Sequence, residues 1–412
     1  MRKISLYLIY LYFLICPLEF IFNAFFGSSV KYIAIVTAGM VAMFFIGNYN
    51  QKIRFGAVQA CLILWAVMQA ASILWTIPYT NTEERLTTYL MMAVLVVMLS
   101  VFPFDTREFK TALWAYTLGC VVLSVLLITN GKMDSGYNYA GRLTINIFDS
   151  YLDPNNLAAI LLTGVFTAFS SIWSKSKITP VSNIFGIAAV ITMIVATLLT
   201  GSRGGIIALI VGFAVYIYAK SNKKSRPIVV LCFAVGVIIA FILAKNLLPP
   251  ELSRRIFEFS EYGSGSGRMA HWVAAIKKIC DNPLFGFGAA SYFGYFSSVQ
   301  GGEFAMHNTF LAVLFEIGLI GLIVFMIPII LGIKSALKTK SALLLAVIFS
   351  NMAAAFFLDT LHTRFFWNAI ALVVIWHEIQ IRQQKEVPFE EKEEGILTVR
   401  RHRRLHFHKK NY

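Results

Sequence analysis

The sequence is poor in charge. Only 14% of its 412 residues are Asp, Glu, Lys or Arg, whereas 58% are hydrophobic and the mean hydropathy is +0.70. A soluble protein of this length exposes far more charge, so the shortage excludes an ordinary soluble domain. The composition indicates a chain that crosses a membrane many times.

Cysteine is also scarce. The five cysteines include no CxxC pair and no cluster with histidine. Four of them fall in apolar runs, and Cys280 stands alone in a polar region. We therefore predict neither a disulfide nor a structural zinc site.

Long apolar runs fill most of the remaining chain. A helix of about 17 to 25 apolar residues crosses the hydrocarbon core of a bilayer. Twelve runs fit: 4–25, 30–47, 56–75, 88–104, 111–129, 155–174, 184–200, 204–220, 227–246, 307–333, 341–358 and 364–380. The expected fold is all-α, a polytopic membrane helix bundle over residues 1–380 with a large, partly helical outer loop at 247–306. A basic tail follows at 381–412.

Lysine and arginine set the expected orientation. With the N-terminus in the cytoplasm, most of them fall in the short inner segments and in the tail, which the positive-inside rule favours. Both termini are then cytoplasmic. The tail, "VRRHRRLHFHKKNY", is interpreted as an anchor beside anionic lipid rather than a nucleic-acid-binding segment.

The conspicuous polar residues gather on the outer side of this topology, above all in the loop 247–306. After "GSGSG", apolar residues recur at helical spacing, which predicts an amphipathic helix from near Arg268 to just before "DNP". Pro283 disfavours its continuation. We expect this helix to lie on the membrane surface or to cap the bundle, and its apolar stripe to serve packing.

Arg203 stands between two apolar runs in "TGSRGG". An arginine there must be paired or reach water, and its planar fork suits phosphate oxygens. The alternative is an interfacial anchor, or a salt bridge to an outer acid such as Glu83 or Asp153. Arg268 follows a flexible stretch that could equally be a linker.

His307 and Asn308 open the tenth apolar run in "HNTFLAVLFEIG". His307 is either an acid–base group or an ordinary interfacial polar residue. Asn308 could cap the helix or orient the ring. Glu316 lies nine positions further on, facing the opposite side of a helix, so we interpret it as a structural acid with a partner on another helix.

Four motifs in this order resemble the O-antigen ligase and O-antigen polymerase superfamily: "LDPNNLA" (152–158), "GSRGG" (201–205), "GRMAHWVAAIKKICDNPLFGFGAASYF" (267–293) and "HNTFLAVLFEIGLIG" (307–321). The resemblance is strong over 150–335 and only topological elsewhere.

The resemblance implies a metal-independent glycosyltransferase of the bacterial cytoplasmic membrane that needs no cofactor. It takes a glycan from an undecaprenyl diphosphate donor at the outer face and passes it to a hydroxyl of another glycan, of lipid A core or of a protein. It also implies that Arg203 and Arg268 hold the diphosphate and that His307 acts near the acceptor hydroxyl.

Elementary chemistry agrees with these roles. The outer side carries no persuasive DxD motif, and two arginines can stabilise a departing diphosphate without a metal ion. His307 can serve as general base. Other outer polar residues either bind sugar or acceptor or pair with a neighbour: Asp153, Asn155, Asn156, Asn308 and Arg364, and also Arg142, Asp359 and His362.

No motif names the acceptor, so polymerase and ligase both stay open, with polymerase slightly favoured. A lipid-linked oligosaccharide transporter is a further alternative. It should have polar sites near the midplane and internal repeats, and only Glu19 beside Pro17 fits that description. A scaffold or sensor would leave the outer cluster of Arg203, Arg268 and His307 unexplained.

Overall fold

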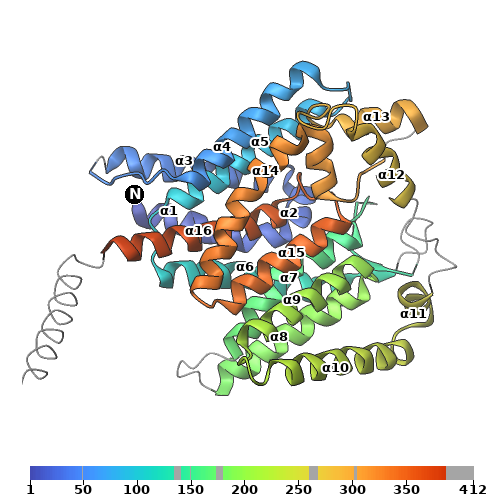
Figure 1. Ribbon diagram of the computed structural model, residues 1–412. Coiled ribbons are helices and arrows are strands. Elements are labelled where there is room, and N and C mark those ends of the chain that lie inside the picture. Colours follow the sequence, from blue (N-terminus) through green and yellow to red (C-terminus); the bar gives the residue numbers. More distant parts are fainter. Residues whose placement is uncertain are drawn as a thin grey trace, which may run out of the picture.

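The computed structural model in Figure 1 describes residues 1–48, 50–133, 141–148, 150–172, 180–258, 268–300 and 304–386. This part of the chain is helical apart from two short β-hairpins, which are a small departure from the predicted all-α fold. The "GSGSG" stretch and most of the predicted tail, from residue 387 on, lie outside the described residues.

The first half contains seven α-helices, two 3-10 turns and the hairpins. Its elements are α1 (Arg2–Ile15), η1 (Cys16–Leu18), α2 (Glu19–Phe26), α3 (Ser29–Gly47), α4 (Ala57–Ala71), η2 (Ser72–Trp75), α5 (Thr82–Val101), α6 (Thr106–Asn130), β1 (Lys132–Met133), β2 (Leu143–Thr144), β3 (Asn146–Ile147), β4 (Ser150–Tyr151) and α7 (Pro154–Ile172). Strand β1 pairs antiparallel with β2, and β3 with β4.

The regular elements described in the second half are all α-helices. Its elements are α8 (Pro180–Leu199), α9 (Arg203–Lys220), α10 (Arg226–Leu247), α11 (Pro250–Phe257), α12 (Arg268–Ile279), α13 (Ser291–Gln300), α14 (Thr309–Lys338), α15 (Ala342–Phe357) and α16 (Arg364–Glu386). The amphipathic helix predicted from near Arg268 is α12, and it ends before "DNP" as expected. Its Met269, Val273 and Ile276 side chains are exposed rather than packed.

Among the described residues, nine helices are long and apolar enough to cross a membrane: Arg2–Phe26, Ser29–Gly47, Ala57–Trp75, Thr82–Val101, Thr106–Asn130, Pro154–Ile172, Arg203–Lys220, Arg226–Leu247 and Thr309–Lys338. The chain is a polytopic membrane bundle. The other three predicted spans are also helices, but Asn183–Leu199 and Ala342–Phe357 are shorter, and α16 is long without meeting the same standard. The count of twelve therefore stays a prediction.

Helix α16 departs from a typical lipid-facing span because it lies inside the bundle. Nearly every side chain from Phe365 to Ile375 is buried, and the helix packs against α5, α14 and α15. A helix enclosed by protein can carry polar groups that lipid would penalise. Asn368, for example, accepts a hydrogen bond from Tyr12 of α1 at 2.9 Å.

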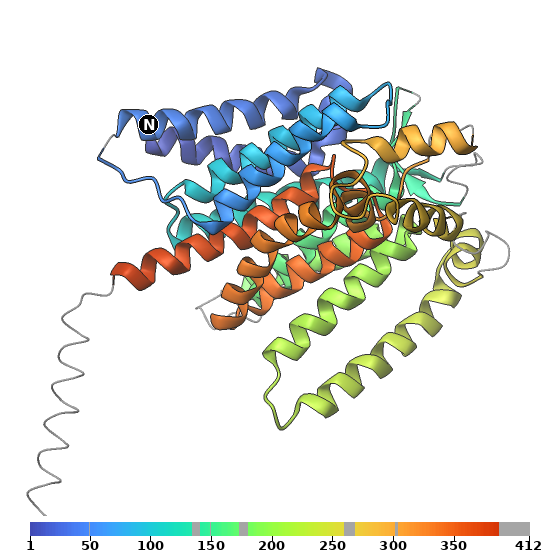
Figure 2. The same ribbon diagram turned by 45° about the horizontal axis from the view of Figure 1, so that its top comes forward.

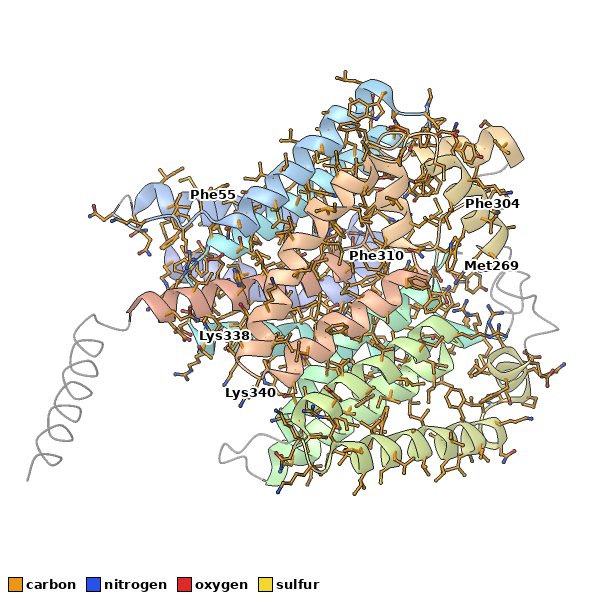
Figure 3. The ribbon with its side chains drawn as sticks, viewed as in Figure 1. Phe55, Met269, Phe304, Phe310, Lys338 and Lys340 are labelled. Carbon is orange, nitrogen blue, oxygen red and sulfur yellow. The ribbon has the colours of Figure 1, made fainter. Side chains whose placement is uncertain are left out.

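The non-spanning helices α11, α12 and α13 gather at one end of the bundle, here named the loop end, away from the N-terminus (Figure 1). Met269 and Phe304 lie at this end, and Lys338 and Lys340 lie toward the other (Figure 3). Helix α10 stands at the edge of the bundle beside α9, with none of its side chains buried (Figure 2).

Glu316 is held inside the bundle by several elements, as predicted for a structural acid. Its carboxylate accepts hydrogen bonds from Gln69 Nε2 of α4 at 3.2 Å, from the Tyr89 hydroxyl of α5 at 3.4 Å and from the Ala290 amide at 2.9 Å. Just beyond it α14 is broken at Ile317 and Gly318, where Gly318 has a φ of 66°.

Replacing Glu316 by alanine should destabilise the fold by roughly 2–4 kcal/mol, because buried donors lose their acceptor. Thermal unfolding in detergent measures the change. Leu319→Ala is the control, since Leu319 is on the same helix and 46% exposed. A Glu316→Ala protein that unfolds at the same temperature as the control would contradict this structural role.

Candidate active site

Arg203 is the first residue of α9, and small residues shape the turn before it. Gly201 has a φ of 61°, a left-handed conformation that favours glycine. The Ser202 hydroxyl caps α9 by accepting a hydrogen bond from the Gly205 amide at 3.2 Å. A Cβ at Gly205 would lie 2.6 Å from that of Ala158, so glycine allows α9 to begin directly against α7. This packing fixes where Arg203 emerges.

The Arg203 guanidinium reaches the last turn of α11. Its Nε donates to the Arg255 carbonyl at 2.8 Å, Nη2 donates to the same carbonyl, and Nη2 donates to the Glu258 carbonyl at 3.1 Å. The carbonyls that end a helix carry partial negative charge, which suits a cation. Arg203 is half-buried, so its charge is held at the surface of the loop end.

Arg268 begins α12 and has unused hydrogen-bonding capacity. Its Nη1 donates to the Phe357 carbonyl at 3.2 Å, whereas its Nε is buried with no hydrogen-bond partner in the described part of the chain. Burial lowers its pKa, Asp153 opposes that effect, and the charge of Arg255 adds to it. A buried N–H without an acceptor is costly, so this position suits an anion from outside the chain.

Phe357, the last residue of α15, lies next to the backbone beside Arg203 and also binds Arg268. A Cβ at Gly204 would lie 3.0 Å from that of Phe357, and Arg268 binds the Phe357 carbonyl. Arg255 connects them a second time, since its carbonyl binds Arg203 and its charge acts on Arg268. Phe357 and Arg255 thus link the elements that carry the two arginines, and the joint binding of a diphosphate by Arg203 and Arg268 stays a prediction.

His307 lies just outside α14 rather than within it. The predicted span began at 307, but the helix begins at Thr309, with Asn308 as its N-cap: the Asn308 Oδ1 accepts from the Leu311 amide at 3.0 Å. His307 itself has a φ of 49°. The helix begins two residues later than predicted because Asn308 is its N-cap, and an N-cap residue and the residue before it do not have helical backbone geometry.

The environment of His307 keeps its imidazole neutral. Burial, and after it the charge of Arg268, lower its pKa to about 4, while Asp359 and Asp153 act in the opposite direction. At neutral pH the ring therefore has a nitrogen lone pair free to accept a proton. The electrostatic effect of Arg268 on this pKa indicates that His307 lies near Arg268.

Comparison with known proteins finds a match to the part of the chain that carries these residues. Residues 188–326 match the family model described as O-antigen ligase. The predicted resemblance to O-antigen ligases is confirmed. An O-antigen ligase of Pseudomonas aeruginosa (strain PAO1) is 24% identical over an alignment of 262 residues, which covers 61% of this chain and 58% of that protein, so the chain matches less than two thirds of the relative's length. The matched O-antigen ligase region contains Arg203, Arg268 and His307.

Asp153, Asn155 and Asn156 precede the O-antigen ligase region, at the start of α7. The Asp153 Oδ1 accepts from the Asn155 amide at 2.8 Å, and the Asn155 Oδ1 accepts from Arg142 at 2.8 Å and from Ser202 at 3.0 Å. These bonds brace the turn that presents Arg203. Asn156 is half-buried in the same helical turn. A role of the three in binding sugar stays a prediction, as does that of Asn308.

Arg364, the first residue of α16, forms an ion pair with Glu19, the first residue of α2, and both side chains are largely buried. Glu19 was the feature that fitted a transporter, and its ion pair with Arg364 gives it a structural role instead. The charge of Arg364 is used within the protein, and its binding of sugar or acceptor stays a prediction.

A second polar cluster surrounds Asp359, and the sequence revealed only part of it. The Asp359 Oδ2 accepts a hydrogen bond from the Tyr292 hydroxyl and lies 3.6 Å from Arg85 Nη1 and 3.8 Å from His362 Nδ1. Arg85 also lies over the Phe293 ring, 3.8 Å from its centroid. Asp359 and His362 were named from the sequence as candidate outer polar residues, whereas Arg85 and Tyr292 were not singled out, because nothing local distinguishes them from the rest of their outer segments.

Within the described ranges, no group of three or more His, Cys, Asp or Glu residues could hold a metal ion. Metal independence of the chemistry stays a prediction.

Proposed function

We propose that the chain is an integral membrane glycosyltransferase of O-antigen ligase and polymerase type. It takes a glycan from an undecaprenyl diphosphate donor and transfers it to a hydroxyl of a glycan or lipid-linked acceptor, without a metal ion or cofactor. One observation carries the proposal: Arg203, Arg268 and His307 all lie in the matched O-antigen ligase region, and Arg268, whose charge acts on His307, has a buried N–H without a partner among the described residues.

The loop end faces the outside of the bacterial cytoplasmic membrane in this proposal, and both termini face the cytoplasm. Lys338 and Lys340 support it, because they lie toward the opposite end of the bundle (Figure 3). Basic residues beside membrane helices favour the cytoplasmic side. Biosynthesis of cell-surface polysaccharide would then take place at the outer leaflet.

The donor's diphosphate lies between Arg203 and Arg268, where guanidinium forks match phosphate oxygens. A cavity of about 220 Å³ begins one turn along α9 from Arg203 and is lined by apolar side chains of α8, α9, α10 and α11. It includes Ile206 and Phe213 of α9, and Ile256 and Phe257 of α11 next to the carbonyl that binds Arg203. Its chemistry suits the first part of a polyprenyl chain.

The proposed reaction is a direct displacement with inversion at the anomeric carbon. The acceptor hydroxyl oxygen bonds to that carbon, the bond to the diphosphate oxygen breaks, and the hydroxyl proton passes to the neutral His307 ring. The two arginines stabilise the negative charge that develops on the leaving diphosphate. Because its pKa is lowered to about 4, the His307 ring is available in its basic, neutral form at working pH, although it is a weaker base than a free histidine.

The acceptor separates the two forms of the proposal. Both matches are described as O-antigen ligase, which favours transfer to a separate acceptor over extension of a growing glycan. A polymerase would lengthen the donor-linked glycan by repeated additions, whereas a ligase would move a whole glycan once to lipid A core or another acceptor.

Reconstitution tests the function. The pure protein is placed in vesicles with an undecaprenyl-diphosphate-linked glycan, a candidate acceptor and a chelator, and new glycosidic bonds are measured by mass spectrometry. We expect bond formation in the presence of chelator, and the product length separates ligase from polymerase. Movement of donor across the vesicle membrane without a new bond would contradict the proposal in favour of a transporter.

A further inference from the structure

Trp272 connects α12 to the segment that carries His307. Its indole Nε1 donates a hydrogen bond to the Met306 carbonyl at 2.8 Å. The ring also packs edge-on against Phe356 of α15, with the centroids 5.5 Å apart and the planes at 75°. The hydrogen bond joins residues that are far apart in the sequence, so it forms only in the folded protein.

The carbonyl that Trp272 binds belongs to the peptide group joining Met306 to His307. His307 has a φ of 49°, in the left-handed region that residues with a side chain rarely occupy. Such a conformation persists only where the surroundings hold it. Trp272 fixes the peptide before His307, and the Asn308 cap fixes the residue after it.

Three hydrogen bonds join α12, the end of α15 and the start of α14 beside the proposed site. Arg268 of α12 binds the Phe357 carbonyl at 3.2 Å, the Thr309 hydroxyl binds the adjacent Leu358 carbonyl at 2.8 Å, and Trp272 returns from α12 to Met306. Arg268 and Trp272 are four positions apart and so occupy the same side of α12. One short helix therefore holds the donor-binding arginine and the backbone of the base.

We propose that Trp272 is a positioning residue: its indole N–H holds His307 in the left-handed conformation and thereby keeps the imidazole at a fixed place beside Arg268. This inference rests on the proposed role of His307 as the base. Trp272 itself touches no reacting atom, and its effect passes through the peptide bond before His307.

Without this hydrogen bond, His307 can relax to a negative φ, which turns its side chain out of the site. The charged and titratable groups that face it are Arg268 and His271 from α12, Asp153 before α7 and Asp359 after α15. Moving the ring toward water removes the effects of burial and of Arg268, the two largest causes that lower its pKa. The pKa of His307 should then rise toward the unperturbed value.

Trp272→Phe tests the inference because it removes the N–H and keeps a ring against Phe356. Trp376→Phe is the matched control. Trp376 lies on α16, away from the site, and its Nε1 donates to the hydroxyl of Thr339, the residue after α14, at 3.0 Å. The pKa of His307 is measured by NMR of histidine-labelled protein in detergent, with the signal assigned through His307→Gln. Transfer kinetics and thermal unfolding are measured on the same proteins.

In Trp272→Phe we expect the pKa of His307 to rise from about 4 toward 6.5. We also expect kcat to fall by about tenfold to a hundredfold while KM for the donor changes by less than about twofold. Trp376→Phe should match the wild type. The inference is overturned if the pKa of His307 stays unchanged, or if donor binding and thermal stability fall together with kcat. If the wild type forms no glycosidic bond, the proposed function fails, and the NMR titration still decides the positioning role.

Discussion

Substituting His307 by glutamine is expected to slow glycan transfer by about 10²- to 10⁴-fold, because the acceptor hydroxyl loses its general base. Glutamine keeps the size and polarity of the side chain but cannot take up the proton. Since Arg203 and Arg268 are unchanged, KM for the donor should change little. Steady-state kinetics with purified protein measure both parameters.

The role of His307 as base also predicts how the transfer rate of the wild type depends on pH. The pKa of His307 is lowered to about 4, so the ring stays neutral and active well below the pKa of about 6.5 of a free histidine. Transfer should be nearly independent of pH from about 8 down to 5 and should fall only below that. A rate that drops by half near pH 6.5 would mean that His307 is not enclosed as described.

His377→Gln is the matched control for His307→Gln. The His377 Nδ1 lies 2.7 Å from the Ser335 hydroxyl, on the far part of α16 from Arg364. This variant should transfer at the wild-type rate. Equal loss in both variants would point to a general sensitivity of the fold rather than to a base at position 307.

Arg268→Ala is expected to weaken binding of the glycan donor and to lower kcat by about 10²- to 10³-fold, because the site loses a guanidinium group that stabilises the leaving diphosphate. Arg203→Ala should act in the same direction. Its effect should be smaller, since the Arg203 guanidinium already binds the Arg255 and Glu258 carbonyls, whereas the Arg268 Nε has no partner among the described residues. Binding of undecaprenyl diphosphate, measured separately from transfer, distinguishes the two steps.

A second consequence of Arg268→Ala concerns His307. Removing the positive charge that lowers the pKa of His307 should raise that pKa, so the acid limb of the pH profile should move upward. Arg226→Ala is the control, because Arg226 lies over the Tyr218 ring at 4.0 Å where α10 begins, and should leave binding and pH profile unchanged. If Arg268→Ala leaves donor affinity at the wild-type value, the diphosphate lies elsewhere.

The sequence predicted the parts of the site that depend on local patterns. Arg203 stood out because glycines surround it in an otherwise apolar region, and His307 because it opens an apolar run. The order of the motifs then indicated that Arg203, Arg268 and His307 belong together. Helix α12 was predictable from its spacing of apolar residues and from Pro283.

The break in α14 could not be predicted in the same way. Around Gly318 the chain from Pro283 to Gly288 lies against the helix: the Leu319 amide donates to the Pro283 carbonyl at 2.8 Å, and the Gly288 amide donates to the Glu316 carbonyl at 2.7 Å. A Cβ at Gly318 would lie 2.2 Å from the Leu284 carbonyl oxygen. These backbone contacts between two segments produce no periodic pattern of apolar residues in either one, so the sequence does not reveal them.

Residues that act through tertiary contacts were missed for the same reason. Trp272 reads as one member of an apolar stripe, and only the fold shows that its N–H reaches the Met306 carbonyl. Arg85 reads as one charge in a polar loop, and only the fold places it beside Asp359. Their partners lie far away along the chain, where spacing rules give no information.

Single-turnover transfer from donor-loaded protein tests the central claim most directly. Wild-type protein and His307→Gln are loaded with equal amounts of labelled undecaprenyl-diphosphate-linked glycan, excess acceptor is added in the presence of chelator, and the new glycosidic bond is followed over time. The account predicts equal loading, rapid transfer by the wild type and transfer slowed at least about a hundredfold in His307→Gln. Transfer by His307→Gln at the wild-type rate would contradict it.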